Sequence, residues 1–220
     1  MRIPDKNKKM VPPFIFKWRG LIMAVATAVI LIVARPTVGS CCCGIVLAIL
    51  GELLRSWALG WTGEHTRSQE LKASFLVTGG PYRYVRNPLY LGNILTGCGV
   101  MLASCGSLSW TASLGVWLWG AFSLYVVYAS CIVSEEAFLA VRFGEIFFNY
   151  KAQTPTILPR WRSLPELIRN FCYADSVPDC THSEGNFFSW KSLSFEYSTW
   201  GWLVFVWLFL FLRAIDKLPL

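Results

Sequence analysis

The residues best suited to chemistry lie in the segment GGPYRYVRNPLYLG at residues 79–92, where tyrosines and arginines come directly before a long apolar run. Its glycines and Pro81 prevent a regular helix from running into the segment, and Pro88 suits the first turn of a new helix. Where such a polar, irregular segment borders a membrane, it lines a cavity or faces water, because lipid cannot satisfy its backbone groups. The segment is therefore a candidate binding site, with a basic, aromatic interfacial anchor as the alternative.

A second candidate is the acidic pair Glu135 and Glu136, which is followed by a Phe-Gly pair, a tyrosine and two prolines within residues 143–159. A positioned carboxylate can bind a ligand or act as a base. The alternative is structural, because Ser134 could cap a helix whose first turn the two acidic side chains would stabilise through the helix dipole.

Three further ionisable residues also have two interpretations. Glu52 and Arg55 lie within an apolar run at a spacing that places them on one helical face. Ionisable residues inside a membrane span are functional candidates, although these two could simply pair with each other. His65 lies in the polar connector 62–78 and is either a site residue or a solvated loop histidine.

The composition predicts the fold class. Of the 220 residues, 55% are hydrophobic and 11 are tryptophan, while the charges are confined to short stretches. This pattern predicts an all-α integral membrane protein of about five transmembrane helices. The expected spans are 20–34 (extended by 14–18), 41–61, 89–104, 110–133 and 200–212. A signal peptide is the competing interpretation of the first span, but further spans follow it and favour a retained anchor.

The distribution of basic residues predicts the orientation of the spans. With five spans, the basic amino terminus, the segment 79–92 and the segment 143–159 all lie on one side, whereas the turn near Cys105 carries no lysine or arginine. By the positive-inside rule, this multi-pass protein has both polar segments facing the cytoplasm. The net charge of +7 suits loops beside anionic lipid, and no nucleic-acid partner is expected because no basic face stands apart from the membrane flanks.

The eight cysteines do not predict a metal site. Cys41, Cys42 and Cys43 are contiguous, and the sequence contains no Cys-x-x-Cys pair. A zinc ribbon or a redox dithiol is therefore not indicated. We expect most of these thiols to pack as small apolar residues among helices.

Two motifs together resemble one superfamily. The segment 79–92 is similar to the Gly-x-Tyr-x-x-x-Arg-His-Pro-x-Tyr-x-Gly signature of the isoprenylcysteine carboxyl methyltransferase and phospholipid methyltransferase superfamily, with Asn87 in place of its histidine. The acidic pair and the segment 143–159 resemble the second signature, with Phe147 in place of a tyrosine. The resemblance covers 51–159 and implies a membrane core over 1–159, followed by a divergent segment 160–220 that ends in a transmembrane helix near 199–213.

The resemblance implies a methyltransferase that uses S-adenosylmethionine and has a cytoplasmic cofactor pocket. Carried over by position, the cofactor-binding residues are Tyr82, Arg83, Arg86, Asn87, Pro88, Tyr90, Gly92, Glu135 and Glu136. The expected catalytic residues are Arg86, Glu136 and His65. Carboxylates can bind an ammonium or ribose hydroxyls, an arginine can bind a carboxylate, and aromatic faces suit a sulfonium or an adenine.

The acceptor implied by the resemblance is lipid-like or prenylated and enters from the bilayer, and no metal is implied. O-methylation of an isoprenylcysteine carboxylate is slightly favoured, although Cys131-Ile132-Val133 stands where such relatives carry a basic residue. N-methylation of a phospholipid amine is the first alternative and would require a base. The others are an NADPH-dependent membrane reductase similar to sterol reductases and a non-catalytic membrane partner protein.

Overall fold

The structure is a computed structural model that describes residues 14–62, 73, 75–172 and 197–215. Across these residues the chain forms helices and connecting loops without any strand, which confirms the all-α prediction. The helices are α1 Phe14–Val33, α2 Val38–Thr62, α3 Pro88–Ser104, α4 Trp110–Phe143, α5 Glu145–Gln153, α6 Leu164–Cys172 and α7 Tyr197–Ala214, with the short 3₁₀ helices η2 Gly80–Arg83 and η3 Trp161–Ser163.

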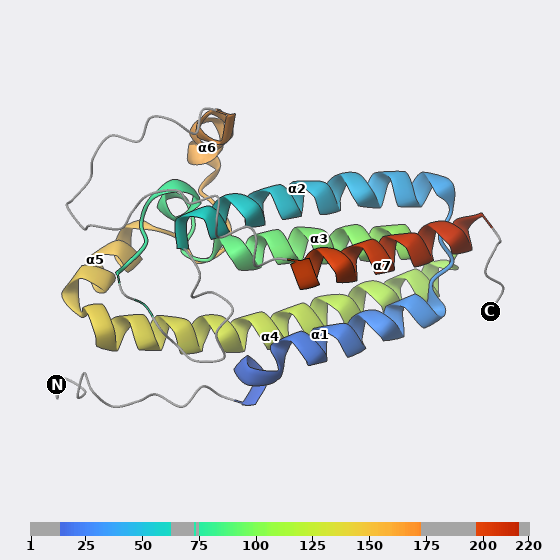
Figure 1. Cartoon of the computed structure of the whole chain (residues 1–220), viewed down its shortest axis with the longest axis horizontal. Coiled ribbons are helices and arrows are strands. Elements are labelled where there is room, and N and C mark those ends of the chain that lie inside the picture. Colours follow the sequence, from blue (N-terminus) through green and yellow to red (C-terminus); the bar gives the residue numbers. More distant parts are fainter. Residues whose placement is uncertain (1–13, 63–72, 74, 173–196, 216–220) are drawn as a thin grey trace.

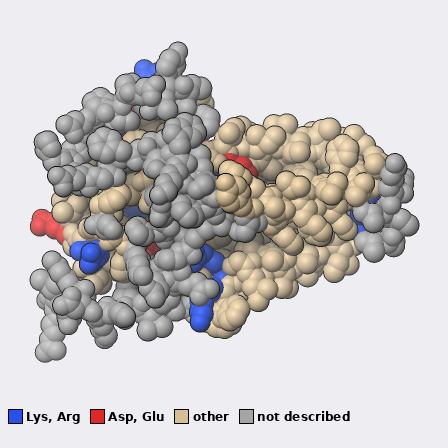
Figure 2. Space-filling model, in the orientation of Figure 1, with Lys and Arg blue, Asp and Glu red and all other residues tan. Residues whose placement is uncertain are grey.

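Helices α1, α2, α3, α4 and α7 lie roughly along one axis, and α5, α6 and η2 gather at one end of this bundle (Figure 1). On the face shown in Figure 2, charged side chains lie mainly toward the α5 end, and the middle of the bundle is almost uncharged. Three helices in the described part of the chain, α1, α2 and α4, are long and apolar enough to cross a membrane, and α3 and residues 199–214 form shorter apolar helices. The five predicted spans thus correspond to five apolar helices, while their number as membrane crossings stays a prediction.

Helices α2 and α3 form the closest pair because glycines face each other across their interface. A Cβ atom on Gly44 would lie 2.4 Å from the carbonyl oxygen of Gly99, and one on Gly92 would lie 2.7 Å from that of Gly51. Small residues let the two backbones approach in this way, which is the usual way membrane helices pack. This contact fixes the start of α3, where the candidate site begins, and gives Gly92 a packing role there.

Helices α1 and α7 complete the bundle. The indole of Trp119 on α4 donates a hydrogen bond to the carbonyl of Ala26 on α1, at 3.1 Å. Leu210 of α7 is fully buried, and Arg213 donates hydrogen bonds of 2.9 and 3.3 Å to the carbonyls of Leu31 and Ile32 at the end of α1. The α7 helix is therefore fixed to the bundle near its carboxyl end.

The acidic pair does not lie where a helix cap would put it. Helix α4 continues without a break ten residues beyond the predicted end of the fourth span at Val133 and ends at Phe143. Ser134 lies inside this helix, and its hydroxyl donates to the carbonyl of Ser130 at 2.7 Å. The capping interpretation is therefore wrong, and Ser109 is the residue that caps α4.

Candidate functional site

A cavity of about 670 Å³ lies inside the bundle and reaches from the η2 end toward its middle. Its walls come from α1, α2, residues 73 and 75–77, η2, α3, α4, α5 and α7. One part of the lining is polar and contains predicted site residues, namely Tyr82, Arg86, Asn87, Tyr90, Glu135 and Glu136. The other part is largely apolar and includes Val100, Met101, Leu124, Leu203 and Val206. The cavity therefore joins a polar compartment to an apolar one.

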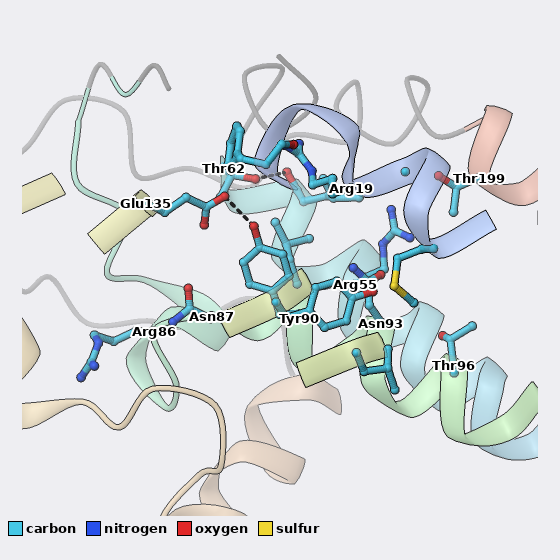
Figure 3. A pocket seen from close by; sticks show the side chains of 18 of the residues that line it. Arg19, Arg55, Thr62, Arg86, Asn87, Tyr90, Asn93, Thr96, Glu135 and Thr199 are labelled. Atoms are coloured by element: carbon cyan, nitrogen blue, oxygen red, sulfur yellow. Dashed lines mark hydrogen bonds between the residues drawn. The ribbon is translucent and has the colours of Figure 1, made fainter. Parts of the chain in front are cut away.

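The centre of the polar compartment is a hydrogen-bonded pair from two helices. The hydroxyl of Tyr90, in the first turn of α3, donates to Oε1 of Glu135 on α4 at 2.6 Å (Figure 3). The ring of Tyr90 packs against Tyr128, with 5.1 Å between the ring centroids. This contact joins the first predicted motif to the second, and it sets the position of a carboxylate on the cavity wall.

Arg86 makes a different set of contacts, all of them with the protein. Its guanidinium forms an ion pair of 2.9 Å with Oε1 of Glu136 and donates to the hydroxyl of Thr156 at 2.7 Å. It also donates to the backbone carbonyls of Lys151, at 3.1 Å, and Thr154. The side chains of Arg86 and Glu136 are only 9% and 14% exposed, so this cluster is largely buried and holds the two motifs together.

The second oxygen of Glu136 is bound as well. Its Oε2 accepts a hydrogen bond of 2.7 Å from the ammonium group of Lys151 on α5. Glu136 thus has a basic partner on each oxygen, whereas its neighbour Glu135 has the phenol of Tyr90. Figure 3 shows Arg86 extending away from the Tyr90–Glu135 pair.

Backbone hydrogen bonds hold the two motifs together beside this cluster. The amides of Arg86 and Asn87 donate to the carbonyls of Pro155 and Thr156, at 2.8 and 3.1 Å, and the side-chain amide of Asn87 donates to the same Thr156 carbonyl. Asparagine is suited to this position because its amide group supplies a neutral donor. The predicted meeting of the two motifs is seen in the structure.

Tyr150 fastens the same region from α5. Its hydroxyl donates to the carbonyl of Tyr82 at 2.6 Å. Burial raises the pKa of Tyr150, and burial also raises the pKa of Tyr82, so both phenols stay protonated at neutral pH. A protonated Tyr150 keeps the donor that holds η2 in place.

The remaining predicted residues are distributed between packing and surface positions. Pro88 is buried at the first turn of α3, as its sequence context predicted. Arg83 is half-exposed, lies 3.7 Å from Glu166 of α6 and is not among the residues that line the cavity. His65 lies outside the described residues. The roles predicted for these residues in binding or catalysis stay predictions.

The cavity also contains polar residues that the motifs did not indicate. Arg19 of α1 lines it, and so do Asn93 and Thr96 of α3. Glu52 and Arg55 line the wall on α2, with 3.7 Å between their charged groups, and Thr96 donates to Oε1 of Glu52 at 3.2 Å. The expected pairing of Glu52 with Arg55 is therefore seen, and because both residues also line the cavity, a functional role stays a prediction.

No group of three or more potential metal ligands is found among the residues that the structure describes. Six cysteines are free thiols, namely Cys41, Cys42, Cys43, Cys98, Cys105 and Cys131. The described residues thus contain no candidate metal centre.

Comparison with known proteins shows that the central part of the chain is similar to a family of methyltransferases. Residues 39–146 match the model of the phospholipid methyltransferase family. A protein-S-isoprenylcysteine O-methyltransferase of Schizosaccharomyces pombe is 32% identical over 114 residues, which are 50% of this chain and 45% of that protein. A probable protein-S-isoprenylcysteine O-methyltransferase of Oryza sativa subsp. indica is 31% identical over 124 residues, covering 53% of this chain and 59% of that protein.

A relative with another name is similar over the same share of the chain. The cobalt-zinc-cadmium resistance protein CzcN of Cupriavidus metallidurans is 36% identical over 118 residues, 53% of this chain and 49% of that protein. The chain spans about half the length of the curated relatives it matches. No solved structure matches it. The matched residues 39–146 contain Arg86, Tyr90 and both glutamates, whereas α1 and α7 lie outside them.

Proposed function

Because residues 39–146 match the model of the phospholipid methyltransferase family and about half of the chain is similar to isoprenylcysteine O-methyltransferases, we propose that this protein is a membrane methyltransferase that uses S-adenosylmethionine. The proposed acceptor is lipid-borne, and O-methylation of a prenylcysteine carboxylate is the favoured reaction. The observation that carries the proposal is that one cavity has both a fixed carboxylate, Glu135, and an apolar compartment in its lining.

The polar compartment has groups that fit the methyl donor. The Glu135 carboxylate suits an ammonium group or ribose hydroxyls, because charge-assisted hydrogen bonds are the strong ones. The buried rings of Tyr82 and Tyr90 suit a sulfonium or an adenine ring. S-adenosylmethionine would supply a methyl group that a nucleophile attacks in line, while the carbon–sulfur bond breaks and its electron pair stays on sulfur.

The chain's own contribution to such a reaction is positioning and exclusion of water. Tyr90 orients Glu135, and the Arg86 cluster fastens the loop that carries Asn87 and the start of α3. Holding two reactants in one orientation removes a large part of the entropic barrier. Asn87, Pro88 and Gly92 therefore support the site through the backbone at the start of α3, and Glu136 supports it through Arg86.

The apolar compartment suits the lipid part of the acceptor. The cavity lining follows α3 from Leu89 to Met101, which at the helical rise corresponds to roughly 18 Å. Met101 and Val206 are buried there, and Gly120 lies against the Met101 sulfur. A long hydrocarbon chain could lie along α3 with its polar end beside Tyr90.

A carboxylate acceptor agrees with the described site better than an amine. An ammonium group must lose a proton before it can attack, so N-methylation requires a base. Of the two described glutamates, Glu136 is held by Arg86 and Lys151, and Glu135 accepts the hydrogen bond from Tyr90. A carboxylate needs no base, and the names of the isoprenylcysteine O-methyltransferase relatives support the same choice.

The proposed orientation places the polar compartment at the cytoplasmic side of the membrane. It is supported by the basic residues of the loops at the η2 and α5 end and by the positive-inside rule. A bilayer is the source of the acceptor in this arrangement.

The proposal is tested by calorimetric titration of the detergent-purified protein with S-adenosylhomocysteine, with NADPH in parallel. Saturable binding of S-adenosylhomocysteine alone, together with methyl transfer to N-acetyl-S-farnesylcysteine, is the expected result. Binding of NADPH would place the protein with the membrane reductases, and binding of neither compound would contradict an enzymatic role that uses these cofactors.

A further inference from the structure

One arginine in the cavity wall comes from a helix that lies outside the family match. Arg19 is in the second turn of α1, whereas the matched segment begins at residue 39. Its guanidinium lies over the ring of Phe16, 4.3 Å from the centroid, and donates to the carbonyl of Phe16 at 3.0 Å. Phe16 is 3% exposed, so this contact anchors Arg19 on a buried ring at the cavity wall.

Arg19 lies at the polar compartment. Its positive charge interacts electrostatically with Tyr90, Cys131 and Glu135. In the view of Figure 3 Arg19 and Glu135 are both drawn above the Tyr90 ring, and Arg86 is drawn below it and to its left. A ligand bound beside the Tyr90–Glu135 pair would therefore lie within the field of this arginine.

The other arginines near the motifs have roles that direct them elsewhere. Arg86 donates to Glu136, Thr156 and two backbone carbonyls. Arg55 is paired with Glu52, and Arg83 is outside the cavity lining. Among the described arginines, Arg19 is thus the one best placed to meet an anionic ligand beside Glu135.

The place of Arg19 in the fold indicates which ligand it meets. The matched segment 39–146 contains Tyr82, Tyr90 and Glu135, the residues that fit the proposed methyl donor. The names of the matched family and of the relatives differ in the acceptor, a phospholipid or an isoprenylcysteine, and the acceptor proposed above arrives from the bilayer. On the bilayer side of α1, the side chains of Trp18, Leu21 and Val25 are exposed, so Arg19 lies on the helix that separates lipid from the cavity.

Building on the proposed function, we infer that Arg19 binds the carboxylate of the lipid-borne acceptor and positions it beside the Tyr90–Glu135 pair. A guanidinium carries five N–H donors, enough to keep the Phe16 contact and also bind a carboxylate. Arginine holds such a group in a defined plane. The residue would therefore determine specificity for an acidic acceptor over a neutral or cationic one.

The test compares Arg19→Met and Arg19→Lys with wild type, using N-acetyl-S-farnesylcysteine as acceptor. Arg142→Met is the matched control, because Arg142 is an exposed arginine in the last turn of α4, outside the cavity lining. For Arg19→Met we expect the KM for the acceptor to rise about tenfold or more, which corresponds to the loss of one charge-assisted hydrogen bond. The dissociation constant of S-adenosylhomocysteine should stay within about twofold of wild type, with Arg19→Lys intermediate in KM.

A second readout does not depend on turnover. Wild type should bind N-acetyl-S-farnesylcysteine more tightly than its neutral carboxamide in a competition assay, and Arg19→Met should lose most of that preference. An unchanged KM and an unchanged preference would overturn the inference. So would weaker binding of S-adenosylhomocysteine with an unchanged acceptor KM, which would assign Arg19 to the donor's carboxylate instead.

These outcomes are distinct from failure of the proposed function. If the wild type neither binds S-adenosylhomocysteine nor methylates the acceptor, the proposed function fails and the inference fails with it. If the wild type does both and Arg19→Met does not differ from it, only the inference about Arg19 is overturned. Binding of S-adenosylhomocysteine by each variant also shows that it has folded.

Discussion

Glu135 and Glu136 are neighbours in sequence but lie in two different environments. Both line the cavity, but Glu135 accepts a hydrogen bond from Tyr90, while Glu136 is held between Arg86 and Lys151. Successive residues of a helix point in directions about 100° apart, so one acidic pair can serve two regions. The comparison indicates that the first glutamate is placed for a ligand and the second holds the loops that shape the site.

The largest expected effect is on stability, from Arg86→Met. The change removes the guanidinium from a partly buried cluster and leaves Glu136 with Lys151 as its remaining cation. Breaking a buried ion pair typically costs about 3–5 kcal/mol. We expect a markedly lower midpoint in thermal denaturation of the purified protein in detergent.

Arg142→Met is the control for the loss of an exposed arginine, and it should leave that midpoint nearly unchanged. If Arg86→Met had the stability of wild type and lost binding of S-adenosylhomocysteine, Arg86 would belong with Glu135 as a ligand-binding residue.

Glu135→Gln should have the opposite effect, with nearly unchanged stability and weaker ligand binding. Glutamine keeps the size of the side chain and can still accept from Tyr90, so stability should change by less than about 1 kcal/mol. The loss of the negative charge should weaken binding of S-adenosylhomocysteine by roughly 10- to 100-fold, which is the usual range for a hydrogen bond to a charged group. Calorimetric titration measures this change, and equal affinities of the two proteins would exclude Glu135 from the donor site.

Tyr90→Phe tests the role of Glu135 through its hydrogen-bond partner. It removes the 2.6 Å hydrogen bond to Glu135 and keeps the ring that packs on Tyr128. Glu135 then loses its orienting partner, and we expect affinity for S-adenosylhomocysteine to fall by about tenfold. A loss of folded protein instead of affinity would show that the pair is structural.

The smallest expected effect comes from Lys151→Met. The Lys151 side chain is 45% exposed, and solvent screens its pairing with Glu136. Stability should fall by less than about 1 kcal/mol, with ligand affinity unchanged. If the stability fell as much as in Arg86→Met in the same denaturation assay, Lys151 would be the main partner that stabilises Glu136.

The sequence was sufficient to predict the helical fold and the meeting of the two motifs. Long apolar runs predict helices directly, and Pro88 marked the start of α3. The resemblance carried by the residues around Arg86 and Glu136 implied that both belong to one region, and the structure joins them at 2.9 Å.

Which residues of that region face a ligand and which hold the loops together was not predictable from the sequence. Whether Arg86 meets a ligand or the carbonyls of residues 151 and 154 depends on how the loop after α5 folds back, which no local pattern encodes. Arg19 looked like a basic flank of the first span, because only tertiary packing brings α1 beside Tyr90. Ser134 looked like a cap because serine before two acidic residues has the same pattern at a helix start and inside a helix.

The most direct test of the account is the thermal midpoint of wild type, Glu135→Gln and Glu136→Gln, each measured with and without saturating S-adenosylhomocysteine. A ligand that binds the folded state raises the midpoint, so one measurement reports both stability and binding. We predict that Glu135→Gln keeps the ligand-free midpoint and loses most of the ligand shift, while Glu136→Gln has a lower midpoint and keeps the shift. The reverse pattern, with the shift lost in Glu136→Gln and kept in Glu135→Gln, would contradict the separation of the two glutamates.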